Sequence, residues 1–298
     1  MKVTYDYYRI FYYVAKYNSF TKAAKMLMNS QPNITRTINN LEEALNCRLF
    51  FRTRTGVTLT PEGEKLFSHV QIAMEHLQVG EQEIENSGKF VSGNLSIAVS
   101  EIALHAFLLE VLRDFHKQYP SVRIKMNNYS SPQAIEAVKN GELELAVVTT
   151  PTNTQRNMSE MVLLPLKMVL VAGPSYSYLK DRKMMLSELV DLPFITLGKQ
   201  TETNRFLDNF FSSCNVLFNP MIEATTSAQI LPLIMYDIGI GILPEALVKD
   251  KIASGEVVEI QLEEKIPNRF VCLTWNKSRP MSTVAQKFID YVCQTAEK

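Results

Sequence analysis

The feature that most constrains the fold is a pattern of short helices and a tight turn within the first sixty residues. Ser19 predicts the start of one helix and Ser30 the start of the next, because serine side chains cap helix N-termini. The turn between them falls at Met28-Asn29, and an amphipathic helix of about 12 residues precedes both, by its apolar spacing. Helices this short and this closely spaced are typical of a helix-turn-helix.

The helix that Ser30 starts has two contrasting faces. Its apolar residues recur at spacings typical of one buried helix face: Ile34, Ile38, Leu41 and Leu45. The other face carries amide, hydroxyl and guanidinium groups, which are the groups that read base edges and grip phosphates. An ordinary solvated helix face is the alternative, but the preceding helix and turn favour DNA. The DNA-contacting residues that we expect in this region are Thr21, Gln31, Pro32, Asn33, Thr35, Arg36 and Asn39.

A basic hairpin follows this helix. The residues from Arg52 to Leu59 are typical of two short strands around a turn at Thr55-Gly56. Arg52 and Arg54 would lie near the tip, where arginine suits a phosphate or a minor groove. Residues 1–60 carry nine Lys or Arg against three acids, a net +6, so the remaining residues carry −6 because the whole chain is neutral. A basic head on an acidic body indicates a DNA-binding module, here a winged helix-turn-helix, fused to another domain.

Five motifs in this region carry a family resemblance. They are Phe11-x-x-Val14-Ala15, Ser19-Phe20-Thr21-x-Ala23-Ala24-x-x-Leu27, Ser30-Gln31-Pro32-x-Ile34-Thr35-Arg36-x-Ile38-x-x-Leu41-Glu42-x-x-Leu45, Leu49-Phe50-x-Arg52 and Leu59-Thr60-x-x-Gly63. Together they resemble the N-terminal domain of LysR-type transcriptional regulators. The resemblance implies sequence-specific binding of double-stranded DNA at an inverted-repeat operator, by a homodimer or a dimer of dimers, and it also allows a contact with RNA polymerase.

A long helix is predicted from Pro61 to about Ser87. Its apolar positions follow heptad spacing over about three repeats: Leu66, Val70, Ala73, Leu77, Gly80 and Ile84. Packing on its own domain is the alternative, but a place between two domains favours pairing with a second copy. The resemblance implies the same, because this segment looks like the family's dimerising linker helix. Ser87-Gly88 and Ser92-Gly93 then mark a flexible boundary.

From Leu95 the pattern becomes an alternation of strands and helices. Strands at Leu95–Val99, Val122–Met126 and Leu143–Val148, with helices between them, predict a parallel α/β sheet. A second α/β unit is predicted from Val162, with strands around 166–171, 194–197, 220–224, 239–243 and 256–260. The segment 270–293 would return to the first unit. This resembles the family's effector-binding domain, similar to periplasmic binding proteins. The expected domains are 1–60 for DNA, 61–90 as linker and 91–298 for the effector, with lobes 93–161 plus 269–298 and 162–268.

Small ligands of such sheets bind beyond the carboxyl ends of the strands. Hydroxyls gather at these predicted ends and ahead of helices, an arrangement that suits a small anion such as a carboxylate. Each could equally be a plain helix cap or turn residue, and Glu101 would favour an amine or point to solvent. The expected effector-binding residues are Ser100, Glu101, Ser130, Ser131, Thr149, Thr150, Thr201, Thr203 and Thr226.

Other functional classes find less support in the sequence. Gly239-Ile240-Gly241 superficially resembles a dinucleotide loop, but Pro244 holds the third glycine position, and the four histidines have no paired nucleophile or metal set. We therefore expect no catalytic residue, no metal site and no cofactor. A solute-binding protein or a nucleoid protein would leave the long head or the large body unexplained. The scattered cysteines, the absence of a signal peptide and the absence of a membrane span predict a cytoplasmic protein with reduced thiols.

Overall fold

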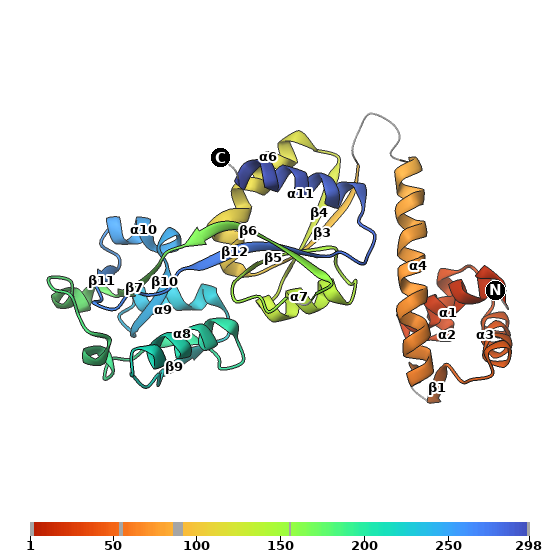
Figure 1. The fold of residues 1–298 in the computed structure, drawn as a ribbon, viewed down its shortest axis with the longest axis horizontal. Helices are drawn as coiled ribbons and strands as arrows, with labels where there is room; N and C mark the ends of the chain where they lie inside the picture. Colours follow the sequence, from red (N-terminus) through yellow and green to blue (C-terminus); the bar gives the residue numbers. More distant parts are fainter. Residues whose placement is uncertain (1–2, 54–55, 86–91, 155, 297–298) are drawn as a thin grey trace. The chain divides into compact units, whose positions relative to one another are not determined.

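The computed structural model describes residues 3–53, 56–85, 92–154 and 156–296. The chain divides into two compact units, Met1–Glu85 and Asn86–Lys298, which are described separately (Figure 1). The N-terminal unit holds α1 (Tyr5–Tyr17), α2 (Phe20–Met26), α3 (Gln31–Leu45), β1 (Phe50–Thr53), β2 (Gly56–Leu59) and α4 (Pro61–Glu85). Strands β1 and β2 pair antiparallel, from Phe50 opposite Leu59 to Thr53 opposite Gly56, so the predicted winged helix-turn-helix is confirmed. Arg54, Thr55 and the predicted boundary at Ser87-Gly88 lie outside the described residues.

The first half of α4 packs on its own unit. Val70 and Met74 are buried in one apolar cluster with Phe11 of α1 and Ile38 of α3, and Leu66 packs against the same cluster. The heptad pattern is therefore divided between two environments. Leu66 and Val70 serve the core of their own unit, whereas Leu77 is 47% exposed and Ile84 is 76% exposed. Periodicity finds an apolar stripe but does not say which partner covers it, so the prediction of one continuous seam was wrong at Leu66 and Val70.

The C-terminal unit is built on a five-stranded sheet and two smaller sheets. The larger sheet has the strand order β4-β3-β5-β12-β6, formed by β4 (Val122–Asn128), β3 (Gly93–Val99), β5 (Leu145–Thr149), β12 (Arg269–Asn276) and β6 (Met158–Leu166). The helices that accompany this sheet are α5 (Glu101–Ala103), the π-helical turn η1 (Leu104–Leu108), α6 (Leu109–Gln118), α7 (Ser131–Lys139) and α11 (Thr283–Ala296). We call this part the first lobe.

The register of the larger sheet confirms part of the sequence analysis and corrects the rest. Strand β3 pairs parallel with β4 and β5, as predicted. The returning strand β12 is antiparallel to both β5 and β6, so the complete sheet is mixed. Strand β6 was not predicted, because its burial does not alternate: only Met158, Leu163 and Leu166 of its nine residues are buried. At the edge of the sheet it leaves Val162 55% exposed.

The second lobe is the part of the chain between β6 and β12. Its strands are β7 (Met168–Ala172), β8 (Ile195–Leu197), β9 (Ile222–Ala224), β10 (Ile240–Pro244) and β11 (Val258–Ile260). Its helices are η2 (Pro174–Leu179), η3 (Leu186–Leu189), α8 (Glu202–Ser213), η4 (Ser227–Gln229), α9 (Ile230–Met235) and α10 (Glu245–Ala253). Strand β7 pairs antiparallel with β10 and β11, whereas β8 and β9 form a separate parallel pair.

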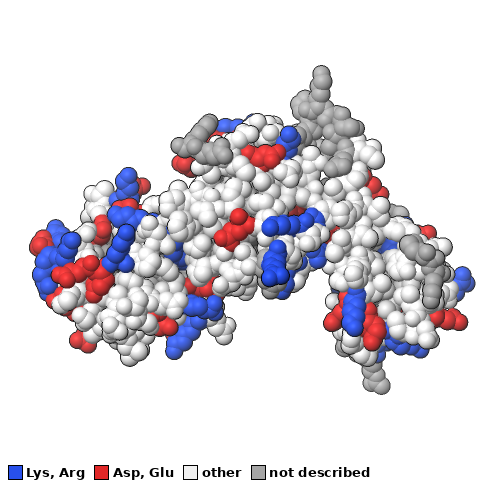
Figure 2. All heavy atoms as spheres, in the orientation of Figure 1, with Lys and Arg blue, Asp and Glu red and all other residues white. Residues whose placement is uncertain are grey.

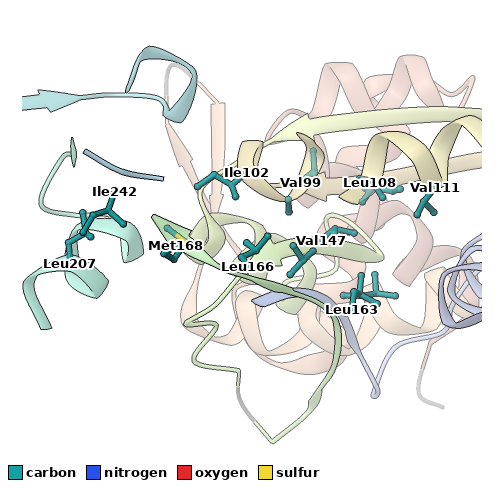
Figure 3. Close-up of a cluster of buried hydrophobic side chains, with 14 of the residues drawn as sticks. Val99, Ile102, Leu108, Val111, Val147, Leu163, Leu166, Met168, Leu207 and Ile242 are labelled. Carbon is teal, nitrogen blue, oxygen red and sulfur yellow. The ribbon is translucent and has the colours of Figure 1, made fainter. Parts of the chain in front are cut away.

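One apolar cluster runs through both lobes. It includes Val99, Leu108 and Val147 around the larger sheet and Leu207 and Ile242 of the second lobe (Figure 3). Leu166 and Met168 belong to the same cluster and lie where β6 leaves one sheet and β7 enters the next. This shared core joins the two lobes at the chain's first crossover, and the second crossover brings the chain back at Arg269.

The split of the α4 stripe makes a testable prediction. Val70→Ala should lower the free energy of opening of the N-terminal unit by about 1–3 kcal/mol, because it leaves a cavity beside Phe11 and Ile38. Leu77→Ala, on the exposed part of the same helix, should change it by less than about 0.5 kcal/mol. Hydrogen exchange of the α1 and α3 amides measures both values. Equal effects would show that the two positions share one environment.

Candidate DNA-binding surface and ligand cleft

The serine caps predicted from the sequence are present at both helices of the helix-turn-helix. The Ser19 hydroxyl accepts a hydrogen bond from the Lys22 amide at 3.2 Å, and the Ser30 hydroxyl accepts one from the Asn33 amide at 3.4 Å. Between them Met28 adopts a left-handed conformation with φ 49°. Asn29 supports the turn, because its side-chain oxygen accepts from the Ser30 amide and from the Asn33 side chain. These local contacts fix where α3 begins.

The polar face of α3 is exposed, as the spacing predicts. Ile34, Ile38 and Leu41 are buried on the opposite face. Thr35 is half-buried, and its hydroxyl accepts from the Gln31 side chain at 3.2 Å. The exposed residues among those predicted to contact DNA are Thr21, Gln31, Pro32, Asn33, Arg36, Asn39 and Arg52.

Two side chains tie the strands of the wing to α3. Arg52 of β1 donates to the Asn39 side-chain oxygen, and its guanidinium lies 5.0 Å from the centre of the Phe20 ring. Asn39, predicted to contact DNA, is thus also held by a residue of the wing. Glu42 is buried at 5% exposure and accepts from the amides of Leu49 at 2.7 Å and Phe50 at 3.2 Å. This role of Glu42 was missed, although an acid beside the apolar stripe of α3 was a signal for it.

Charge on the second lobe is arranged differently from the basic excess of the first sixty residues. On the face drawn in Figure 2, blue and red spheres alternate over this lobe. Many of these charges are paired, including Lys167 with Glu245, Arg182 with Glu188 and Lys251 with Glu256. Paired charges produce no extended field of one sign, so this face does not have the character of a nucleic-acid surface.

A cleft of about 240 Å³ opens between the lobes of the C-terminal unit. Eight of the nine predicted effector residues line it: Ser100, Glu101, Ser130, Ser131, Thr149, Thr201, Thr203 and Thr226. The sequence did not identify further polar lining residues, chiefly Asn128, Gln133, Glu202, Ser227 and Arg269, whereas Thr225, next to the predicted Thr226, lines the cleft as well. Thr150 is not among the lining residues, because its hydroxyl accepts from the Phe270 amide at 2.9 Å. Its expected place in the cleft was therefore wrong.

Most of the cleft hydroxyls already have a structural partner. Thr201 caps α8 by accepting from the Asn204 amide at 3.2 Å, and Ser130 donates to the Gln133 side chain at 2.8 Å. Ser131 joins α7 to β5, since its hydroxyl donates to the Thr149 carbonyl and accepts from the Thr149 amide. Thr226 caps η4. These residues therefore have the structural role, helix cap or turn residue, that the sequence analysis gave as the alternative to effector binding.

Ser100 and Glu202 differ from the other lining residues. Each is 7% exposed, and neither Ser100 Oγ nor Glu202 Oε2 has a hydrogen-bond partner in the described structure. Ser100 stands at the N-cap position of α5 without making the cap bond. A buried polar atom without a partner costs free energy, so such atoms at a cleft indicate a place for a ligand or ordered water.

Arg269 supplies a buried positive charge at the cleft. It is 1% exposed, and its donors reach the Thr150 carbonyl at 2.6 Å, the Thr203 hydroxyl at 3.0 Å and the Thr149 hydroxyl at 2.9 Å. Burial lowers the pKa of Arg269 to about 10, and the nearby Glu202 carboxylate opposes that shift. The residue therefore remains a cation at neutral pH. Its position directly before an apolar strand was the only signal for it in the sequence.

Glu101 makes a contact between the lobes. Its Oε2 accepts from the amide of Ala228 in η4 at 3.0 Å, so a first-lobe carboxylate reaches a second-lobe backbone group. The sequence left open whether Glu101 faces a ligand amine or solvent. In the structure its carboxylate instead binds a backbone amide of the other lobe. Both segments line the cleft, through Glu101 and through Ser227 of η4.

The described part of the chain contains no group of three or more His, Cys, Asp or Glu side chains placed to hold a metal ion. The four cysteines all lie within the described residues, and none of them is in a disulfide. Burial raises the pKa of Cys272 to about 12, so this thiol is not primed for reaction at neutral pH. None of the helices within the described ranges has the length and apolar character needed to cross a membrane.

Comparison with known proteins agrees with this arrangement. Residues 5–64 match the bacterial regulatory helix-turn-helix protein of the lysR family, and residues 89–297 match the LysR substrate binding domain. The transcriptional regulator BbuR of Bordetella bronchiseptica is 28% identical over 260 residues, which cover 87% of this chain and 80% of BbuR. A full-length variant of OxyR from Pseudomonas aeruginosa superposes with a TM-score of 0.75 at 18% identity, covering 99% of this chain and 95% of OxyR.

A second solved structure, full-length CbnR complexed with its target DNA, has a TM-score of 0.58 at 17% identity and covers 99% of this chain and 100% of CbnR. At these identities both structures show a shared fold. The fold and the two family matches define a DNA-binding transcriptional regulator with an effector-binding domain, and not an enzyme. The chain belongs to the LysR family.

The different partners of two cleft serines make a testable prediction. Ser131→Ala should destabilise the C-terminal unit by about 1–3 kcal/mol, because both hydrogen bonds to Thr149 are lost. Ser100→Ala should change its stability by less than about 0.5 kcal/mol or raise it, because Ser100 Oγ has no partner to lose. Urea unfolding followed by fluorescence of Trp275, the single tryptophan, measures both. A large loss for Ser100→Ala would contradict this assignment.

Proposed function

We propose that this regulator recognises an inverted-repeat operator as a homodimer, or a dimer of dimers, under the control of a small effector that carries an anionic group and binds between the lobes. The observation that carries the DNA-reading part is the exposed face of α3. There Gln31, Asn33 and Arg36 present amide and guanidinium groups to solvent. The target-DNA complex of CbnR, a protein of the same fold, supports it. We assign DNA reading to residues 1–60, pairing to 61–90 and effector binding to 91–298, and we expect the regulator to act in the cytoplasm.

Dimerisation is assigned to the second half of α4. Val70 is used by the core of its own unit, which leaves Ala73, Leu77 and Ile84 exposed at spacings of four and seven residues. Gly80 lies between them, and a Cβ built there would meet no atom within 4 Å. Small and aliphatic residues along one exposed stripe suit the close approach of a second α4. The expected contact is therefore shorter than the sequence alone predicted.

The effector is assigned to the cleft on the strength of Arg269. A desolvated cation whose partners among the described residues are neutral oxygens is well placed to bind a carboxylate or another small anion. Ser100 would contribute its unpartnered hydroxyl. Binding would change the closure of the two lobes, which Glu101 already joins to Ala228. The regulator would then pass that change to its DNA-binding units.

Substitutions on α3 test the DNA-reading surface. Arg36→Ala should weaken binding to specific and scrambled duplexes alike, because a guanidinium on this face is expected to contact phosphate. Gln31→Ala should cost roughly 1–3 kcal/mol on the operator only and relax the preference at particular base pairs. Fluorescence anisotropy measures both, and Arg9→Ala on α1, which removes an exposed arginine paired with Asp6, is the control. Unchanged affinity for both α3 variants would exclude this helix from the groove.

A charge on the exposed stripe of α4 tests the dimer. Leu77→Asp should raise the dimer dissociation constant at least tenfold, roughly 1.4 kcal/mol or more, because two carboxylates would face each other in an apolar contact. Ser68→Asp, at an exposed position on the opposite side of α4, should leave it unchanged. Analytical ultracentrifugation gives both values. A Leu77→Asp protein that pairs normally would assign the dimer to another surface.

A further inference from the structure

The cleft presents a buried charge of each sign, and Arg269 is the positive one. Its three hydrogen bonds run to a carbonyl and two hydroxyls, all of them neutral. Among the described residues no carboxylate lies within ion-pair distance of it. Each terminal nitrogen of the guanidinium carries a second N–H that these bonds do not use. The Glu202 carboxylate favours the charged guanidinium from beyond ion-pair distance, so Arg269 has no direct anionic partner and the cleft can admit one.

Glu202 is the negative one. It is the first residue of α8, and its Oε1 accepts from Arg205 at 2.6 Å. Its Oε2 is buried and has no donor. A carboxylate oxygen can only accept, so the missing partner is a donor, and a cationic donor makes the stronger bond in a buried site. Arg205 is 56% exposed, so its pairing with Oε1 is weakened by solvent and does not satisfy Oε2.

These two charges lie close together on the lining of one cleft. Thr203, which accepts from Arg269, directly follows Glu202 in the first turn of α8. A ligand with only a carboxylate would bring its negative charge near Glu202, and a ligand with only an amine would face Arg269. A ligand with both groups pairs with each residue and remains neutral overall. The volume of about 240 Å³ lies below the roughly 300–1,000 Å³ typical of drug-sized ligands, so such a ligand is small.

We propose that the effector is a small zwitterion of the α-amino acid type, with its carboxylate on Arg269 and its ammonium group on Glu202 Oε2. Ser100 Oγ, buried and unpartnered at the same cleft, binds one of the two groups. This inference rests on the proposed function and specifies the ligand class at that site. It also separates Glu202 from Glu101, whose carboxylate is used by the Ala228 amide.

Titration calorimetry on the full-length protein at neutral pH tests the ligand class. The probes are the standard α-amino acids and, for each, the carboxylic acid without the amino group and the amine without the carboxylate. At least one amino acid should bind, and both of its analogues should bind at least tenfold more weakly. A carboxylic acid that binds as tightly as its amino acid, or a full series of amino acids without binding, overturns the proposal.

Variants locate the ammonium site. Glu202→Gln should weaken the amino acid at least tenfold and should not weaken the matching carboxylic acid, because the substitution also removes the repulsion between Glu202 and that ligand's negative charge. Asp208→Asn, which makes the same charge change at an exposed position of α8 outside the cleft, should alter neither. Ser100→Ala, which breaks no bond within the chain, should weaken the amino acid about threefold or more and covers the case in which Glu202→Gln does not fold. Equal losses for both ligands on Glu202→Gln would contradict the assignment.

The same ligands in an operator-binding assay separate this inference from the proposed function. A carboxylate without an amino group that shifts operator binding through Arg269 would leave the proposed function standing and exclude the zwitterion. If no amino acid, carboxylate or amine alters operator binding, both the zwitterionic effector and the proposed control by an effector in this cleft are excluded. An amino acid that binds the cleft and shifts operator binding supports both.

Discussion

The C-terminal unit depends on one buried guanidinium at the place where the chain returns to its first sheet. Arg269 opens β12, donates to the Thr150 carbonyl and the Thr149 hydroxyl at the end of β5, and donates to Thr203 in the first turn of α8. It thus holds the end of a first-lobe strand and the start of a second-lobe helix in one hydrogen-bonded group. Phe206 adds a ring contact, with the guanidinium 5.4 Å from its centre. Because a cation is expensive to bury and these bonds hold it in place, the arrangement gives the cleft a fixed positive charge.

The sequence predicted best those features that local spacing determines. The caps at Ser19 and Ser30 and the polar face of α3 follow from residues within a few positions of each other, and all are present. The sequence also predicted most of the cleft hydroxyls, because the carboxyl ends of parallel strands must meet at one edge. These predictions needed only helix and strand periodicity.

The sequence could not predict pairings between distant segments. Arg269 meets Thr149 across 120 positions and Glu101 meets Ala228 across 127 positions, and no local pattern marks either pair. The same limit explains the error on α4, where Val70 and Leu77 share one stripe but only Val70 meets its own core. It also explains β6 and the antiparallel β12, whose places in the sheet depend on long-range pairing.

Two polar contacts between the lobes differ in how a ligand would affect them. The Glu101 bond to Ala228 runs between a carboxylate and a backbone amide near solvent, so it is weak and can break when the lobes move apart. The Arg269 bonds are buried, and the depressed pKa of about 10 still leaves the guanidinium charged at neutral pH, so a change of pH near neutrality would not release them. A ligand paired with Arg269 would add charge-assisted bonds on the buried side, while the bond between Glu101 and Ala228 could still break. Such a ligand would therefore change how tightly the lobes close without having to rearrange the core that joins them, and this is the property that a ligand-controlled regulator requires.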